Sequence, residues 1–286
     1  MSSSEDRIIA LIDMDCFFCQ VESREQPELK NKPMVVCQSN VVLAVSYEAR
    51  ARGVNRFVRA EEAKEVCPEL NVVSSPISYG KSDNTKYRSA GQEVIEVLKK
   101  HCQTVERASI DEAYLDITSL VEDRLQANSI SSMDLKNLLK NTFVVGYCNE
   151  TNEDEKRAEG LEKWIEEVFD DMTDDEARKL GMAALIVEEL RAEILEKCQF
   201  TCSAGISYNK VLAKLACGLH KPNKQTILHS SEVMQLFKTV PVNKVRSLGG
   251  KVGKVLMESL NCKFMSDLMG ISLQEMQKHF DDKTAM

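Results

Sequence analysis

The sequence predicts an α+β fold in which a sheet of antiparallel and mixed strands precedes an all-helical C-terminal unit. Apolar runs of strand length alternate with segments whose apolar residues recur at helical spacing over residues 1–118. After Ser230 the pattern is one of short helices separated by Pro and Gly residues. A chain of 286 residues that is 43% hydrophobic can divide its core among two or three subdomains.

The first expected element is an apolar strand over 8–12, which ends at Asp13 and leads into a helix over 16–24. The elements expected after the first helix are strands over 34–37 and 41–47, helices over 48–52, 60–66 and 87–100, and strands over 104–106 and 110–117. Gly53 closes the helical turn over 48–52.

A polar segment over 119–175 interrupts this alternation. It is rich in Glu, Asp, Asn and Ser and contains a charged run over 152–159, so we expect at least part of it to be a mobile surface insertion. The elements expected after it are a helix over 183–197, a strand over 203–207, a helix over 209–218 and a strand over 225–228.

The charge of the chain is unevenly distributed. The formal net charge of −8 argues against a protein that binds nucleic acid over its whole surface. Residues 119–200 contain 20 acidic and 10 basic residues, whereas residues 201–286 contain 6 acidic and 12 basic residues. A basic C-terminal third is expected if only that part contacts a polyanion, although a solvated surface would give a similar pattern.

The sequence carries no sign of membrane insertion or export. No stretch reaches about 18 uninterrupted apolar residues, and the N-terminal MSSSEDR lacks the basic start and apolar region of a signal peptide. We therefore expect an intracellular chain whose ten cysteines stay reduced. Cys16 and Cys19 form a C-x-x-C, but without the turn glycines and partner pair of a zinc site, so buried thiols are the preferred interpretation.

Acidic residues interrupt two apolar strands, in the segments IALIDMDCFF and ASIDEAYLD. Burying ionised carboxylates is costly unless a positive charge compensates them. If these strands are antiparallel neighbours, Asp13, Asp111 and Glu112 meet at one edge and could hold two divalent ions that activate a hydroxyl and stabilise a leaving pyrophosphate. In the alternative interpretation Asp13 and Asp15 are helix N-caps, and the other two are turn residues.

Three further segments supply cations that could hold phosphate groups. Tyr47 and Arg50 are three residues apart on a helical turn, either as a phosphate clamp or as a core tyrosine beside a surface arginine. Lys221 stands in a K-P-N turn that could direct its ammonium at a phosphate. The segment 249–254 either contacts a nucleic-acid backbone or is a plain inter-helix hairpin, and its spacing differs from that of a Walker A loop. The residues concerned there are Gly249, Gly250, Lys251, Gly253 and Lys254.

Five segments, in this order, carry a resemblance to a known family: ALIDMDCFF, VSYEARARGV, ERASIDEAYLDIT, CSAGISYNKVLAKLACGLHKPNKQT and VRSLGGKVGK. In these segments the chain resembles a Y-family translesion DNA polymerase over residues 7–280. The segments DMDCFF, ASIDEAYLD, GLEKWIEEVF and VRSLGGK are similar to the eta branch of that family rather than to the iota and kappa branches.

The resemblance implies a palm, a fingers subdomain and a thumb. Residues 1–17 and 76–228 would form the palm, with a βαββαβ-type sheet and an acidic insertion over about 119–175. Residues 18–75 would form small fingers, and residues 229–286 an all-helical thumb with a helix-hairpin-helix-like contact to the DNA backbone. In the family a little-finger domain follows, with tails that bind the sliding clamp and ubiquitin. Since the sequence stops at Met286, we expect these to be absent and DNA binding to be weak and salt-dependent.

The resemblance also implies roles for individual residues. Asp13, the backbone carbonyl of Met14, Asp111 and Glu112 would bind two Mg²⁺ ions, with Mn²⁺ as an alternative, so that a primer 3′-hydroxyl attacks the α-phosphorus of a dNTP. The implied nucleotide contacts are Phe18 as the steric gate against a 2′-hydroxyl, Phe17 beside the sugar, Tyr47, Arg50 and Lys221 on the triphosphate, and Gln38 and Arg56 at the bases. Without the resemblance, Phe17 and Phe18 would be interpreted as an apolar stripe of a helix.

The expected function is therefore nucleotidyl transfer by a nuclear DNA-directed DNA polymerase of the lesion-bypass type. Its partners would be primer-template DNA and dNTPs, its templates would include cyclobutane pyrimidine dimers, and no membrane would be involved. One alternative is a truncated isoform with little or no polymerase activity that acts as a DNA- or partner-binding module. Another is a nucleotide cyclase on a similar sheet, which would leave the K-P-N turn and the segment 249–254 without a purpose.

Overall fold

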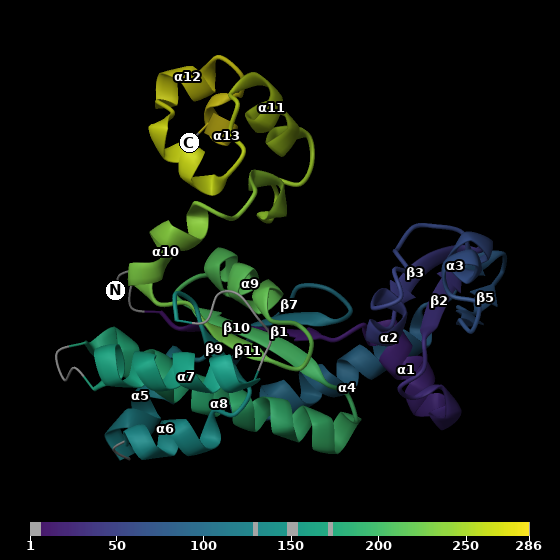
Figure 1. Cartoon of the computed structure of the whole chain (residues 1–286), viewed down its shortest axis with the longest axis horizontal. Coiled ribbons are helices and arrows are strands. Elements are labelled where there is room, and N and C mark those ends of the chain that lie inside the picture. The colour runs from purple at the N-terminus through teal and green to yellow at the C-terminus, as the bar shows by residue number, and fades with distance from the viewer. Residues whose placement is uncertain (1–6, 128–130, 148–153, 171–173, 286) are drawn as a thin grey trace.

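The computed structural model describes residues 7–127, 131–147, 154–170 and 174–285. A central six-stranded sheet is flanked on one side by a small three-stranded sheet, and a helical C-terminal unit begins with α10 (Ser230–Phe237) (Figure 1). This combination of helices with a multistranded sheet confirms the mixed composition expected from the sequence.

The central sheet has the strand order β7-β8-β1-β10-β11-β9. Strand β1 (Ile9–Met14) lies antiparallel between β8 (Glu112–Asp116) and β10 (Cys202–Ser207). Strand β7 (Thr104–Arg107) pairs with β8 in the antiparallel sense, whereas β11 (Gln225–Ile227) and β9 (Thr142–Val144) continue the sheet in parallel. The acidic segments thus form two neighbouring strands, and β1 runs through Asp13 instead of ending before it.

Helices cover the two faces of this sheet. Helices α4 (Thr85–His101) and α8 (Asp175–Cys198) pack together below it in Figure 1, and α9 (Lys210–Leu219) lies above it against β10 and β1. Successive side chains of β1 project to opposite faces of the sheet. Ala10 and Ile12 lie in the large core, and Leu11 lies in the core beneath α9. Gly205 permits the close approach of α9, since a Cβ there would lie 2.0 Å from the Ala213 carbonyl oxygen.

The segment between the first strand and α4 builds the three-stranded sheet. Its order is β3 (Val41–Val45), β2 (Met34–Gln38) and β4 (Asn71–Ser74), with a separate small core on one face. The accompanying elements are α1 (Phe17–Glu25), η1 (Pro27–Leu29), α2 (Tyr47–Arg50), α3 (Ala60–Val66), β5 (Ile77–Ser78) and β6 (Lys81–Ser82).

The described part of the acidic segment 119–175 contributes to the central sheet and its core, while residues 128–130, 148–153 and 171–173 lie outside the described residues, so the expected surface insertion stays a prediction. Strand β9 completes the central sheet, and Trp164 at the end of α7 (Asp154–Trp164) is fully buried. The other elements of this segment are α5 (Thr118–Ala127), α6 (Ser132–Leu138) and the π-helix η2 (Ile165–Phe169). The first two residues of the charged run, 152–153, lie outside the described residues, while 154–159 is the start of α7. Polar composition therefore reflects the exposed faces of helices whose apolar faces are buried.

The C-terminal unit is helical throughout its described residues. It consists of α10 (Ser230–Phe237), η3 (Val242–Lys244), α11 (Lys251–Ser259), η4 (Met265–Gly270), α12 (Leu273–Gln277) and α13 (Asp282–Ala285). Val242, Leu256 and Cys262 form its small core. In the part of the chain described here, no helix is long and apolar enough to span a bilayer.

Candidate active site

The register of the central sheet places two carboxylates side by side. Asp13 on β1 is directly opposite Glu112 on β8, and opposed residues of an antiparallel pair project from the same face with Cβ atoms about 5 Å apart. Asp111 lies in the turn before β8, where its carbonyl oxygen accepts a hydrogen bond of 2.9 Å from the amide of Met14. The two acidic strands are therefore neighbours, as a shared cation site requires.

These residues line a cavity of about 340 Å³ between the central sheet and the three-stranded sheet. Its lining consists of Asp13, Met14, Cys16, Phe17, Phe18, Leu43, Ala44, Tyr47, Arg50, Arg56, Asp111, Glu112 and Lys221. The structure thus brings together all the expected metal-binding and nucleotide-contacting residues except Gln38, which is half-buried at the end of β2. Cys16, Leu43 and Ala44 were not anticipated, and the two aliphatic residues show no sequence signal beyond a position in an apolar strand.

Lysines compensate the two opposed carboxylates. The Lys221 ammonium lies 2.5 Å from Asp13, and the Lys214 ammonium donates a hydrogen bond to Glu112. Burial raises the pKa of Asp13 to about 7, even though Lys221 opposes this effect. Burial also acts to raise the pKa of Glu112, but hydrogen bonds from Lys214 and Asp13 hold it below its ordinary value.

Lys214 was not anticipated as a site residue. Lys210 and Lys214 are one turn apart on α9, and they pair with Glu106 and Glu112 on adjacent strands. The i, i+4 spacing was visible in the sequence, but the identity of the partners depends on the packing of α9 over the sheet.

The acidic residues are suited to a hard divalent cation, although each now has another partner. Carboxylate and carbonyl oxygens are the ligands that Mg²⁺ prefers, and burial of Asp13 favours an adjacent positive charge. Ser109 donates a hydrogen bond of 2.5 Å to Asp111, while the other two carboxylates face lysines. Within the described ranges, no three Asp, Glu, His or Cys side chains converge closely enough to hold a metal ion. The side chains must therefore exchange partners before they bind one.

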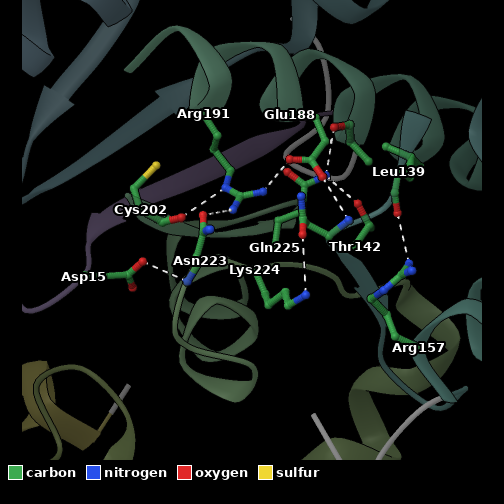
Figure 2. A network of polar contacts seen from close by, with 12 residues as sticks. Asp15, Leu139, Thr142, Arg157, Glu188, Arg191, Cys202, Asn223, Lys224 and Gln225 are labelled. Carbon is green, nitrogen blue, oxygen red and sulfur yellow. Dashed lines mark hydrogen bonds and ion pairs between the residues drawn. The ribbon is translucent and has the colours of Figure 1, made fainter. Parts of the chain in front are cut away.

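Asp15 has a structural role, contrary to the interpretation that it caps a helix. It is buried and accepts hydrogen bonds from the Ser203 hydroxyl at 2.7 Å and from the Asn223 amide at 2.8 Å. Cys16 is the N-cap residue of α1, and no side chain caps that end. Figure 2 shows Asp15 and Asn223 within a polar network that includes Arg191 of α8. This network holds the turn that carries Lys221 against the ends of β1 and β10.

Tyr47 and Arg50 are the first and last residues of the one-turn helix α2. The Ser46 hydroxyl caps this helix by accepting a hydrogen bond of 3.3 Å from the Ala49 amide. The Arg50 guanidinium lies 4.7 Å from the centre of the Tyr47 ring, and its Nε donates to the Val45 carbonyl. Burial raises the pKa of Tyr47 to about 12, so its phenol stays protonated and can donate to an anion.

The two phenylalanines of α1 differ in their environment. Phe17 is 2% exposed and packs edge-on against Phe200, so the interpretation as an apolar core residue holds for it. Phe18 is half-buried, and its ring stacks on Tyr87 of α4 with ring centres 3.8 Å apart. The stack fixes the ring of Phe18 where it borders the cavity.

The Gly- and Lys-rich segment 249–254 lies outside the cavity lining, in the C-terminal unit. Gly250 precedes α11, and Lys251 and Lys254 are exposed on its first turns. Gly253 is required by packing, since a Cβ there would lie 1.6 Å from the Leu248 carbonyl oxygen. The exposed lysines and the helix N-terminus leave this segment suited to an anion.

Comparison with known proteins adds independent findings. Residues 12–218 match the impB/mucB/samB family, and residues 240–286 match the DNA polymerase eta/Rev1 helix-hairpin-helix motif. DNA polymerase eta of Drosophila melanogaster is 41% identical over 99% of this chain and 34% of its own length, and that of Arabidopsis thaliana is 42% identical over 99% and 42%. DNA polymerase iota of Homo sapiens is 31% identical over 96% of this chain and 34% of its own length.

A solved structure described as a Dbh ternary complex with partially disordered substrates is similar over 97% of this chain and 64% of that chain, with a TM-score of 0.66 and 25% identity. The chain thus spans between a third and a half of the length of the curated relatives named here.

Proposed function

This chain belongs to the impB/mucB/samB family, the Y family of DNA polymerases, and we propose on that basis that it is a translesion DNA polymerase of the eta type. It would transfer a nucleotide from a dNTP to a primer 3′-hydroxyl opposite damaged template bases such as cyclobutane pyrimidine dimers. The observation that carries this proposal is the single cavity lined by three carboxylates, a stacked Tyr-Arg pair and Lys221.

The three parts of the fold support a division by function. We propose a palm over 1–17 and 76–228, fingers over 18–75 and a thumb over 229–286. The carboxylates lie on the sheet of the proposed palm, and Tyr47 and Arg50 come from the proposed fingers. In the proposed thumb, Lys251 and Lys254 would meet the DNA backbone.

Asp13, Asp111, Glu112 and the Met14 carbonyl would hold two divalent ions, which we propose to be Mg²⁺. When bound, such ions lower the pKa of a hydroxyl nucleophile and neutralise charge on the phosphates. For this, Asp13 and Glu112 must release Lys221 and Lys214. Lys221, freed from Asp13, would then pair with the triphosphate, so the same ammonium would compensate the carboxylate before the substrate binds and the phosphates afterwards.

The remaining lining residues would select and orient the nucleotide. Tyr47 would donate its phenolic hydrogen, and Arg50 its guanidinium, to phosphate oxygens. Phe18, held by its stack on Tyr87, would exclude a ribose 2′-hydroxyl. Gln38 and Arg56 would touch the template and incoming bases, although Gln38 lies outside the present cavity lining.

Partners and location follow from the substrate. We propose primer-template DNA and dNTPs as ligands and a nuclear location, since the eta relatives named above are eukaryotic. Contacts with the sliding clamp and ubiquitin stay predictions of the family resemblance.

Primer extension on undamaged and thymine-dimer templates tests the proposal. The Asp111→Ala/Glu112→Ala variant should lose on the order of a hundredfold or more of the incorporation rate on both templates. The matched control is Glu106→Ala, which removes an exposed carboxylate of β7 outside the cavity lining and should retain activity. DNA binding with no incorporation by the unmodified chain would instead favour the non-enzymatic binding module.

A further inference from the structure

Two cysteines bracket the phenylalanines that line the active-site cavity. Cys16 is the N-cap residue of α1, and Cys19 lies in its first turn, where its amide donates a hydrogen bond of 2.8 Å to the Cys16 carbonyl. Both side chains also line one cavity behind the helix. A C-x-x-C at the start of a helix is the spacing at which two thiols can form a disulfide within one turn.

The backbone at Cys16 favours this contact. Its φ of 37° and ψ of 51° are left-handed, which turns the chain sharply between β1 and α1. The turn places Cys16 directly before the first turn of the helix, where its carbonyl accepts from the Cys19 amide. The thiol pair is therefore produced by the same bend that sets the Phe17 and Phe18 rings beside the cavity.

Cys16 is also accessible from two sides. It lines the active-site cavity and a second cavity of about 380 Å³, which Asp15, Cys19, Gln20 and residues from the end of α8 also line. Cys16 is half-buried, whereas the other cysteines in the described ranges are buried. A small reagent can thus reach Cys16 from either cavity, and the less exposed Cys19 borders the second cavity.

We propose that Cys16 and Cys19 are a redox-active dithiol, and hence a modification site for a hydroperoxide at the edge of the active-site cavity. Attack of the Cys16 sulfur on hydrogen peroxide forms a sulfenic acid and releases one water. Attack of the Cys19 sulfur on that sulfenic acid then forms the disulfide and releases a second water. The two thiols lose two protons and two electrons in total, and the peroxide is reduced to two waters.

The alternative interpretation is that Cys16 and Cys19 have only a packing role, as small apolar side chains. It explains Cys19, which is 2% exposed and adjoins the Met34 carbonyl. It does not explain why the half-buried thiol that lines two cavities shares one of them with a second thiol one helical turn away. A zinc site is not supported either, since no third ligand converges on the pair among the described residues.

Disulfide formation is tested by exposing the whole chain to hydrogen peroxide, alkylating free thiols and digesting with trypsin. Cleavage after Arg7 and Arg24 yields a peptide whose only cysteines are Cys16 and Cys19. We expect this peptide to escape alkylation and to be lighter by two hydrogens, and we expect a dithiol reductant to reverse the change. A doubly alkylated peptide, or Cys16 oxidised to sulfinic acid without the disulfide, would overturn the proposal.

Matched variants separate the dithiol from general thiol oxidation. In Cys19→Val, whose side chain keeps an apolar residue at that site, Cys16 should stop at a sulfenic acid that a dimedone probe captures. Cys102→Val removes a buried cysteine at the end of α4 and should leave disulfide formation unchanged. Equal disulfide yields in Cys19→Val and the unmodified chain would show that Cys16 pairs with another cysteine and would refute the assignment.

A second consequence rests on the proposed function. If the nucleotide occupies the cavity, it covers one approach to Cys16, so oxidation and nucleotide binding compete. With primer-template DNA, Mg²⁺ and a dNTP at about ten times its Kd, we expect oxidation to slow by up to about tenfold if entry through the active-site cavity dominates. Disulfide formation at an unchanged rate would show that the peroxide enters through the second cavity and would leave the dithiol itself intact.

Discussion

The ammonium of Lys221 lies 2.5 Å from the carboxylate of Asp13, although the two residues are more than two hundred positions apart in the chain. The family resemblance assigns Lys221 to a triphosphate and Asp13 to a metal ion. In the structure the ammonium and the carboxylate compensate each other's charge, so the site is charge-compensated before a metal ion or a triphosphate binds. Substrate binding on this view is an exchange of partners and not the filling of an uncompensated acidic site.

A pH dependence follows from the raised pKa of Asp13. Burial brings this pKa to about 7 from 3.8, so the stabilising contribution of the protonated carboxyl is fully present below about pH 4 and lost as the pH rises through 7. A divalent cation competes with that proton. We therefore expect millimolar MgCl₂ to raise the Tm more at pH 8 than at pH 5, as measured by differential scanning fluorimetry.

Asp13→Asn is the control for this effect, because its amide does not titrate. The variant should show a smaller Mg²⁺-dependent rise in Tm, with little difference between the two pH values. In Lys221→Met the Mg²⁺-dependent rise in Tm should appear only at a higher pH, because Lys221 acts to lower the pKa of Asp13. An equal rise in Tm at pH 5 and pH 8 for the unmodified chain would contradict the assigned titration.

The acidic strands could be predicted from the sequence because charge within an apolar run is a local signal. Alternation along each strand then determines that Asp13 and Glu112 share a face, once the strands are known to be neighbours. The pairing of Glu112 with Lys214 could not be predicted, since it depends on how α9 crosses the sheet. Trp164 was missed for another reason: the charged residues around it dominate the composition of its segment, while its own side chain is fully buried.

The two phenylalanines of α1 should respond differently to truncation. Phe18→Ala opens the cavity where a ribose would lie, so we expect discrimination against ribonucleotides to fall by about one to two orders of magnitude with little loss of stability. Phe17→Ala removes a ring that is 2% exposed and should lower the free energy of unfolding by about 3–5 kcal/mol. Single-nucleotide incorporation with dNTPs and rNTPs, together with urea unfolding, separates the two effects. The opposite pattern would mean that Phe17 borders the sugar.

The Arg191 network is expected to be a main source of stability near the site. Arg191 is 6% exposed, pairs with Glu188 and donates to Asn223 and to the Cys202 carbonyl (Figure 2). Arg191→Met leaves the Glu188 carboxylate without its cation, so the free energy of unfolding should fall by about 3–5 kcal/mol. The control is Arg124→Met, whose pair with Glu189 is exposed and should contribute less than about 1 kcal/mol. Equal losses in urea unfolding would show that burial does not distinguish the two pairs.

The same network should control the position of Lys221 through Asn223. Asn223→Ala removes the side-chain acceptor for Arg191 but keeps the backbone amide that donates to Asp15 at 2.8 Å, so the turn loses its attachment to α8 and keeps the one to Asp15. The lost hydrogen bond should lower the free energy of unfolding by about 1 kcal/mol, and the φ of 53° at this position, which Ala adopts less readily than Asn, should add to the loss. Because the turn that carries Lys221 is then less constrained, KM for the dNTP should rise several-fold while kcat changes less. Steady-state incorporation kinetics measures both constants, and a fall in kcat at constant KM would place the effect of Asn223 on the carboxylates instead of the nucleotide.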